Sequence, residues 1–215
     1  PLSQLELAVF FYRIGKLTAL HFPLMKLTKY KLSFTAASLS LSESTKIAEV
    51  YLACKNWDET AKIVKDQNLL QSRTSSRTKR VLRELTQRLQ KLSDEQLLLL
   101  IEGNLSEQKH LLWFAICQTY LFIQEFAIEV LHEKFMSLNL EITELDYDAF
   151  FNRKADWHEE LEIITVKTKA KLRQVVFRML READLLTDEN TIIRTMLSPR
   201  LINVLLSRHL AGLRS

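Results

Sequence analysis

A row of cations between Thr165 and Leu186 is the first feature of this sequence that could carry a chemical function. The row contains no acid before Arg181, and an amide side chain lies within it. Arginine, lysine and glutamine side chains can hold phosphates or hydrogen-bond to base edges in a DNA major groove. We therefore predict a nucleic-acid contact made by Thr165, Lys167, Thr168, Lys171, Gln174, Arg178 and Arg181.

An earlier stretch, 73–91, has the same character. It contains seven basic residues and the single acid Glu84. Each phosphate that such cations neutralise contributes affinity that depends on salt and not on base sequence, because bound counterions are released. Hydroxyls and amides at a helix start can bind phosphates as well. The predicted contacts are Arg73, Thr74, Ser76, Arg77, Lys79, Arg80, Arg83 and Arg88.

Helical periodicity places both sets of cations opposite an apolar stripe. Leu172, Val175 and Val176 in one stretch recur at the spacing of a buried helical face, as do Leu82 and Leu85 in the other. Each stretch follows two shorter predicted helices and a turn, which is the plan of a helix-turn-helix module. The predicted helices are 43–54, 57–66 and 74–92 in the first module, and 146–154, 158–163 and 165–186 in the second.

Capping residues mark the ends of several of these segments. Ser93 and Gln96 have the spacing of a capping box, in which the first side chain bonds the backbone amide of the third helical residue. Ser40 and Glu43 have the same capping-box spacing. Gly103 is expected to end a helix in a left-handed conformation. The other expected N-caps are Asn56 and Thr165.

Composition favours an all-α protein. The 215 residues are 47% hydrophobic and include only three glycines and three prolines, so the turn residues that sheets and phosphate-binding loops need are scarce. Leucine and the charged helix formers are abundant, which favours helices throughout. We expect a helical extension at 1–24, a helix-turn-helix lobe at 25–104, a central core helix at 105–140 and a C-terminal helix-turn-helix lobe at 141–215.

The most apolar segment, 111–131, admits two interpretations. An apolar run of about twenty residues is long enough to span a bilayer. Gln118, Glu125 and Glu129 interrupt the run, however, and a helix that is apolar nearly all round is also the expected spine of an all-helical core. We therefore predict a buried central helix and no membrane partner.

Asp188, Glu189 and Asn190 form a predicted turn between short β-branched segments after the second basic helix. A small hairpin in that position is the wing of a winged helix-turn-helix, although so short a hairpin is weakly encoded. A winged and a wingless second module both fit the sequence. Ser198 and Pro199 then occupy the N-cap and first helical positions of a final helix.

No constellation of residues predicts catalysis or a bound metal. The sequence lacks the Gly-rich phosphate-binding motifs and the nucleophile elbow, and its five histidines have no paired metal-ligand spacing. Cys54 and Cys117 are expected to be buried thiols of a cytosolic protein. Trp57, Trp113 and Trp157 are expected in the core. We therefore expect no enzyme activity, no cofactor and no metal site.

Six segments together resemble the BrxA family. They are YKLSFTAASLSLSES, LLQSRTSSRTKRVLRELTQRL, LLWFAICQTY, DAFFNRKADWHEELE, TKAKLRQVVFRMLREADLL and LSPRL. The resemblance covers about 26–206 and implies a small, all-helical, cytoplasmic and non-enzymatic accessory of bacterial BREX phage-exclusion systems. It also implies duplex binding by helix-turn-helix modules, with contacts in the matching basic segments 73–88 and 167–181. The family has no catalytic residue to carry over.

We therefore predict an antiviral-defence accessory that binds double-stranded DNA with low or unknown sequence specificity. Single strands are less favoured, because aromatic residues and cations do not alternate in the way that stacking of unpaired bases requires. The alternative is an interaction scaffold whose basic faces dock acidic protein partners within a BREX assembly. In either case we expect a cytoplasmic monomer that contacts other BREX components.

Overall fold

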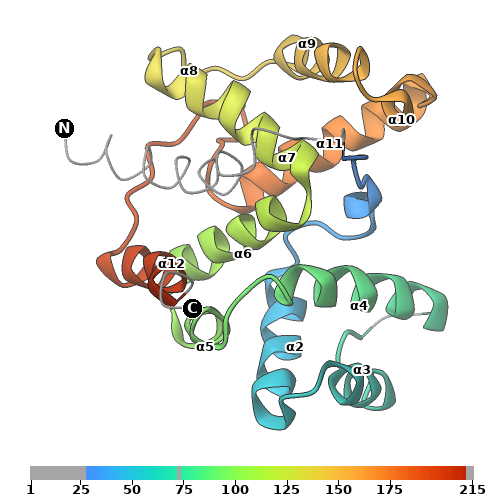
Figure 1. Cartoon of the computed structure of the whole chain (residues 1–215), viewed down its shortest axis with the longest axis vertical. Helices are drawn as coiled ribbons and strands as arrows, with labels where there is room; N and C mark the ends of the chain where they lie inside the picture. Colours follow the sequence, from blue (N-terminus) through green and yellow to red (C-terminus); the bar gives the residue numbers. More distant parts are fainter. Residues whose placement is uncertain (1–27, 72–73, 212–215) are drawn as a thin grey trace. The chain divides into compact units, whose positions relative to one another are not determined.

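The computed structural model describes residues 28–71 and 74–211, and these residues are helical apart from turns and a few isolated bridges (Figure 1). No β-strand occurs in the described part of the chain. The prediction of an all-α protein is therefore confirmed. The predicted extension 1–24 and Arg73 lie outside the described residues.

Two compact units make up the chain, and each is assembled from two separate pieces. Unit 1 contains 28–35 and 116–196, whereas unit 2 contains 36–115 and 197–211. We expected the final helix in a lobe with 141–198. Instead, α12 (Pro199–Ala211) packs against α5 (Asp94–Glu102) in unit 2, where Leu201 and Val204 are buried.

Unit 2 is a cluster of helices around α2 (Leu41–Cys54), which contacts α3 (Trp57–Asp66), α4 (Ser75–Leu89) and α5. α6 (Leu105–Thr119) starts in this unit and ends in unit 1. The predicted apolar stripe of α4 is buried, since Leu82, Leu85 and Leu89 are almost wholly inaccessible to solvent. This burial leaves the opposite face of α4 outward.

Local capping signals set most of the predicted helix ends. The Asn56 side chain accepts hydrogen bonds from two amides in the first turn of α3, and Ser93 starts the predicted capping box of α5. Ser40 makes no capping bond, because it lies before α2 in a left-handed conformation with φ of 54°. Gly103 is not left-handed, since its φ is −67°. A side chain is disfavoured there because an added Cβ would lie 2.5 Å from the Leu99 carbonyl oxygen.

Unit 1 has a core of aromatic rings. Phe122 and Phe126 meet Phe150 with 5.2 and 5.4 Å between ring centroids, in edge-to-face arrangements that such rings prefer. These contacts join the helix Leu121–Phe126 to the helix Glu144–Ala155. After α6, the unit contains α7 (Leu121–Phe126), the π-helical turn η2 (Ala127–His132), α8 (Glu133–Met136), α9 (Glu144–Ala155), α10 (Glu159–Glu162) and α11 (Val166–Glu182). The short 3-10 helix η1 (Ser33–Ala36) comes earlier in the chain, at the boundary between the two units.

The predicted central helix is interrupted at Tyr120. α6 ends at Thr119 and α7 begins at Leu121, and between them Tyr120 is extended, with φ of −122° and ψ of 99°. The Tyr120 ring is fully buried against Phe34, 5.5 Å away between centroids, and its hydroxyl lies 3.3 Å from Ser33 Oγ. No single described helix is long and apolar enough to cross a membrane, although the bent pair Leu105–Thr119 and Leu121–Met136 meets the length and composition together.

The chain folds back on itself after α11, around the predicted turn. Thr187 N donates a hydrogen bond to Thr191 O at 2.9 Å, and an isolated antiparallel bridge joins Leu186 to Ile192. A second bridge ties Thr191 to Glu141. Pairing this short forms no strand, so the wing stays a prediction.

The expectations for tryptophan and cysteine hold in part. Trp113 is fully buried and Trp57 is half-buried, but Trp157 is 74% exposed, so its predicted place in the core is wrong. Cys54 and Cys117 are both free thiols. Burial raises the pKa of Cys117, which keeps that thiol protonated, whereas Cys54 is only half-buried. No group of three His, Cys, Asp or Glu residues in the described ranges could hold a metal ion.

Candidate functional site

The cations of α11 fall into two groups. Arg173 faces α9, where its guanidinium pairs with Glu144 at 2.7 Å and with Asp148 at 2.9 Å. Lys169 also reaches Asp148, at 3.4 Å. The charges of this group are therefore neutralised within unit 1. The second group consists of the predicted contacts Lys167, Lys171, Arg178 and Arg181.

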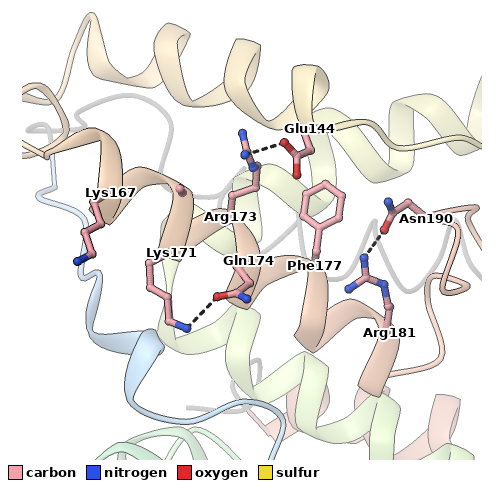
Figure 2. A pocket seen from close by; sticks show the side chains of 9 residues that line it. Glu144, Lys167, Lys171, Arg173, Gln174, Phe177, Arg181 and Asn190 are labelled. Atoms are coloured by element: carbon pink, nitrogen blue, oxygen red, sulfur yellow. Dashed lines mark hydrogen bonds and ion pairs between the residues drawn. The ribbon is translucent and has the colours of Figure 1, made fainter.

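A groove with a volume of about 530 Å³ opens beside α11 (Figure 2). Glu144 is the one acid among its lining residues, so the groove is positively charged and suits an anion such as a phosphate. Four predicted contacts meet in it, namely Lys167, Lys171, Gln174 and Arg181, and the other lining residues are Glu144, Ala170, Arg173, Phe177 and Asn190.

Two hydrogen bonds fix side chains of this groove, as Figure 2 shows. Lys171 Nζ donates to Gln174 Oε1 at 2.8 Å, and Arg181 Nη2 donates to Asn190 Oδ1 at 2.6 Å. Asn190 is itself held, because its carbonyl accepts a hydrogen bond from Ile142 N at 2.9 Å. The sequence identified Asn190 only as a turn residue, and nothing in its spacing from Arg181 indicated their contact.

The other predicted contacts of α11 do not line the groove. Thr165 is the N-cap of α11 as predicted, and its Oγ1 accepts a hydrogen bond from Thr168 N at 3.2 Å. Both threonines are exposed at the helix start. Arg178 is exposed as well, and its nearest acid is Glu182, at 3.8 Å along the same helix.

The cations of α4 present a second basic surface, with one exception. Arg77, Lys79, Arg80 and Arg83 are all exposed, as are Thr74 and Ser76 at the helix start. None of these four cations pairs with an acid in the part of the chain that the structure describes. Lys79 and Ser75 also line a small hollow of about 260 Å³ with Lys65, Asn68 and Thr78.

Arg88 is the exception, and its predicted DNA contact is wrong. The side chain is 2% exposed and pairs with Glu84 at 2.8 Å. Its guanidinium also donates to the carbonyl oxygens of Ala37 and Ser38, at 3.0 and 2.5 Å. A buried charge requires such partners, because it has lost its contact with water. Arg88 therefore ties the segment before α2 to α4 and is not available to a ligand.

The two predicted helix-turn-helix modules differ in their turns. α10 and α11 are separated by 163–165, a turn of the length that the motif uses. α3 and α4 are separated by 67–74, which is longer than the motif requires. The local geometry before α11 thus resembles the motif more closely, although α10 has only one turn.

Sequence comparison identifies the family. The family model of BrxA matches residues 28–209. The chain belongs to the BrxA family. Both α4 and α11 lie within the matched range, so the two basic surfaces fall in the part of the chain that the family model covers.

A relative and a solved structure extend this comparison. A "BREX protein BrxA" from Bacillus cereus (strain H3081.97) is 30% identical over 123 residues, which are 57% of this chain and 62% of the relative. This chain thus matches less than two thirds of that BrxA relative. The crystal structure of an uncharacterized protein from Magnetospirillum magneticum has a TM-score of 0.73 at 21% identity, and the match covers 86% of this chain and 95% of that one. The latter similarity shows a shared fold.

Proposed function

We propose that this BrxA-family protein binds double-stranded DNA as an accessory of a BREX phage-defence system. The observation that carries the proposal is the groove of α11, where Lys167 and Lys171 meet no acid among the described residues within ion-pair distance. Lysines placed in this way neutralise phosphates and release counterions, which favours any duplex over a neutral ligand.

The surface of α4 supports the same proposal. Arg77, Arg80 and Arg83 are exposed and have no acidic partner in the described ranges, so their charges are available to phosphates. The exposed starts of α4 and α11 add backbone amides and threonine hydroxyls, which also bind phosphate oxygens. Each unit therefore offers one basic helix to the DNA backbone. We further propose that α9, α10 and α11 act as a helix-turn-helix with 186–192 as its wing.

Limited sequence specificity follows from how the groove side chains are held. Gln174 reads adenine by using both its amide oxygen and its amide nitrogen, and that oxygen would then have to be shared between adenine and Lys171 Nζ. Arg181 is similarly engaged with Asn190. Contacts to phosphates carry no base information. We therefore propose that binding affinity comes mainly from the backbone.

Membership of the BrxA family supports a place beside other BREX components. The match to the relative named "BREX protein BrxA" has the same implication. We propose a cytoplasmic monomer that has no catalytic activity of its own and that contributes DNA binding to the defence system.

The test is a titration of the protein into a fluorescein-labelled duplex, and separately into one of its strands alone. Fluorescence anisotropy measures binding at about 50 and about 200 mM salt. The duplex should bind more tightly than the strand. Its affinity should fall roughly a hundredfold between the two salt concentrations if about four phosphates are contacted. The variant Lys167→Glu/Lys171→Glu should lose at least about tenfold in affinity, because it replaces two attractive charges by two repulsive ones.

A charge-matched control is Lys29→Glu/Lys31→Glu, which changes two exposed lysines of the same unit outside the groove. The control should bind the duplex like the unchanged protein, and circular dichroism should show the same helical signal for both variants. Equal duplex binding by the groove variant would reject the proposal. Failure of the unchanged protein to bind duplex at low salt, together with salt-resistant binding to a BREX protein, would favour the scaffold instead.

A further inference from the structure

Three large apolar side chains are exposed around α10. Trp157 is 74% exposed, Ile163 83% and Val166 86%, and all three lie within ten residues of one another in unit 1. Single apolar residues are common at protein surfaces, but several large ones exposed along so short a segment are typical of an interaction site. Tryptophan in particular is enriched among the residues that carry most of the binding energy of protein interfaces.

α10, which lies between Trp157 and Ile163, is fixed to unit 1 by its inner face. Leu161 is buried, and Glu160 accepts a hydrogen bond from Tyr30 N at 2.6 Å. The Tyr30 ring stacks on His158, with 3.9 Å between ring centroids. The Tyr30 hydroxyl is anchored in turn by Glu125 at 2.5 Å. Since one face of the short helix is fixed inward, its opposite face is held toward solvent before any partner binds.

The outward face of α10 also carries acids. Glu159, Glu162 and Ile163 have the i, i+3, i+4 spacing that brings helical residues to one face. Asp156 precedes Trp157, and like the two glutamates it is exposed and pairs with no cation in the described ranges. The surface is therefore apolar with an uncompensated negative rim, which differs in sign from the groove of α11.

We infer that Trp157, Ile163 and Val166, with the rim of Asp156, Glu159 and Glu162, form a docking surface for a basic segment of a partner protein. Charge complementarity selects this occupant: lysines or arginines that flank an apolar anchor would meet both the acids and the apolar side chains. DNA is disfavoured, because its phosphates would be repelled by three carboxylates. This surface goes beyond the proposed DNA binding, because it assigns protein contact to apolar and acidic side chains around α10 and leaves DNA contact to the cations of α11.

The experiment uses the full chain and each of the other BREX proteins of the same system, purified separately and titrated by calorimetry. One of them should bind, and Trp157→Ala/Ile163→Ser should weaken that binding about thirtyfold or more, as loss of a central anchor does. Glu159→Lys/Glu162→Lys should weaken it as well. Because these side chains are exposed, the substitutions should leave the fold unchanged, which thermal unfolding checks.

Two control variants match these changes elsewhere in unit 1. Leu145→Ala removes another side chain that is 78% exposed, and Asp188→Lys/Glu189→Lys reverses two exposed acids outside the surface. Both should bind the BREX partner like the unchanged protein. The inference is overturned if no BREX protein binds, or if binding is equal in all variants. If Trp157→Ala/Ile163→Ser reduces only duplex affinity, the occupant is DNA and the inference is overturned. If the same variant abolishes a self-association that the unchanged chain shows, the occupant is a second copy and the inference is likewise overturned.

Discussion

The guanidinium of Arg181 is held by the side chain of Asn190, whose Oδ1 accepts a hydrogen bond from Nη2 at 2.6 Å. The two residues come from different elements, since Arg181 lies in the last turn of α11 and Asn190 lies in the turn that follows. An arginine whose position is fixed in this way loses less side-chain entropy when it binds an anion. Asn190 is thus a positioning residue for the groove.

We expect Asn190→Gly to weaken duplex binding about threefold and Arg181→Ala to weaken it about tenfold, because only the second change removes a charge. Glycine is the suitable replacement, since Asn190 has a φ of 62° that other side chains tolerate poorly. Anisotropy titrations at several salt concentrations separate the two effects. The slope of log affinity against log salt should fall by about one for Arg181→Ala and stay unchanged for Asn190→Gly. An equal slope change in both variants would contradict a positioning role.

The two basic helices should contribute differently to DNA binding. Four of the predicted contacts meet in a groove beside α11, whereas the arginines of α4 lie exposed on the helix surface, as in a phosphate clamp. We therefore expect Lys167→Glu/Lys171→Glu to weaken binding more than Arg77→Glu/Arg80→Glu. The α4 variant should weaken all duplex sequences alike. A larger loss from the α4 variant, measured on the same set of duplexes, would reverse the assignment.

Arg88 should matter for stability and not for DNA affinity. Removing one partner of a buried ion pair leaves the other charge without compensation, so Arg88→Ala should lower the free energy of unfolding by about 3–5 kcal/mol. Urea unfolding followed by circular dichroism measures this change. Replacing both partners, as Glu84→Leu/Arg88→Met, should restore part of the loss. If Arg88→Ala folds but loses duplex affinity, Arg88 contributes to DNA binding and its role is not purely structural.

Asp146 should make the stability of unit 1 depend on pH in the acid range. Burial raises the pKa of Asp146, but hydrogen bonds from Lys134 and from Thr143 N and Oγ1 outweigh that effect, so the folded pKa lies below its usual value. The unfolded chain then binds the proton more readily. The stabilisation is present above about pH 4 and is lost as the pH falls through the lowered folded pKa.

Melting temperatures of the unchanged protein and of Asp146→Asn measured from neutral to acid pH check this prediction. The unchanged protein should be more stable at neutral pH, and the difference should shrink below about pH 4. Glu141→Gln, which alters an exposed acid of the same unit that pairs with no cation in the described ranges, is the control. A difference that is constant over the whole range would exclude Asp146 as the titrating group.

Features set by neighbouring residues were predictable from the sequence, whereas contacts between distant residues were not. Thr165 and Asn56 cap helices because their side chains reach amides two or three residues away. Arg88 and Arg77 lie close together on a helical wheel, but Arg88 is buried and Arg77 is exposed. The difference arises because Ala37 and Ser38, which are 51 and 50 residues away in the sequence, pack against Arg88.

The same distinction explains the other differences. Tyr120 interrupts the central helix where its ring is buried against Phe34, a contact across 86 residues that has no local signal. Trp157 was expected inside because tryptophan is large and apolar, yet the anchoring of α10 through Tyr30 decides which face of that short helix is buried. In the groove, the lysines were evident from their spacing, but the pairing of Arg173 with α9 depended on tertiary structure.

Each unit is assembled from two pieces of chain, and this has a consequence for how the protein can be divided. A cut at one peptide bond cannot release either unit, because cleavage between α6 and α7 leaves 197–211 attached to the fragment that carries α9 to α11. Gln96 Nε2 donates a hydrogen bond to the Val204 carbonyl at 3.3 Å, so α12 would still hold the fragments together after such a cut. A polypeptide for unit 2 alone must join 36–115 directly to 197–211. Such a polypeptide would contain α4 without α11, so the DNA binding of one basic helix could be measured in the absence of the other.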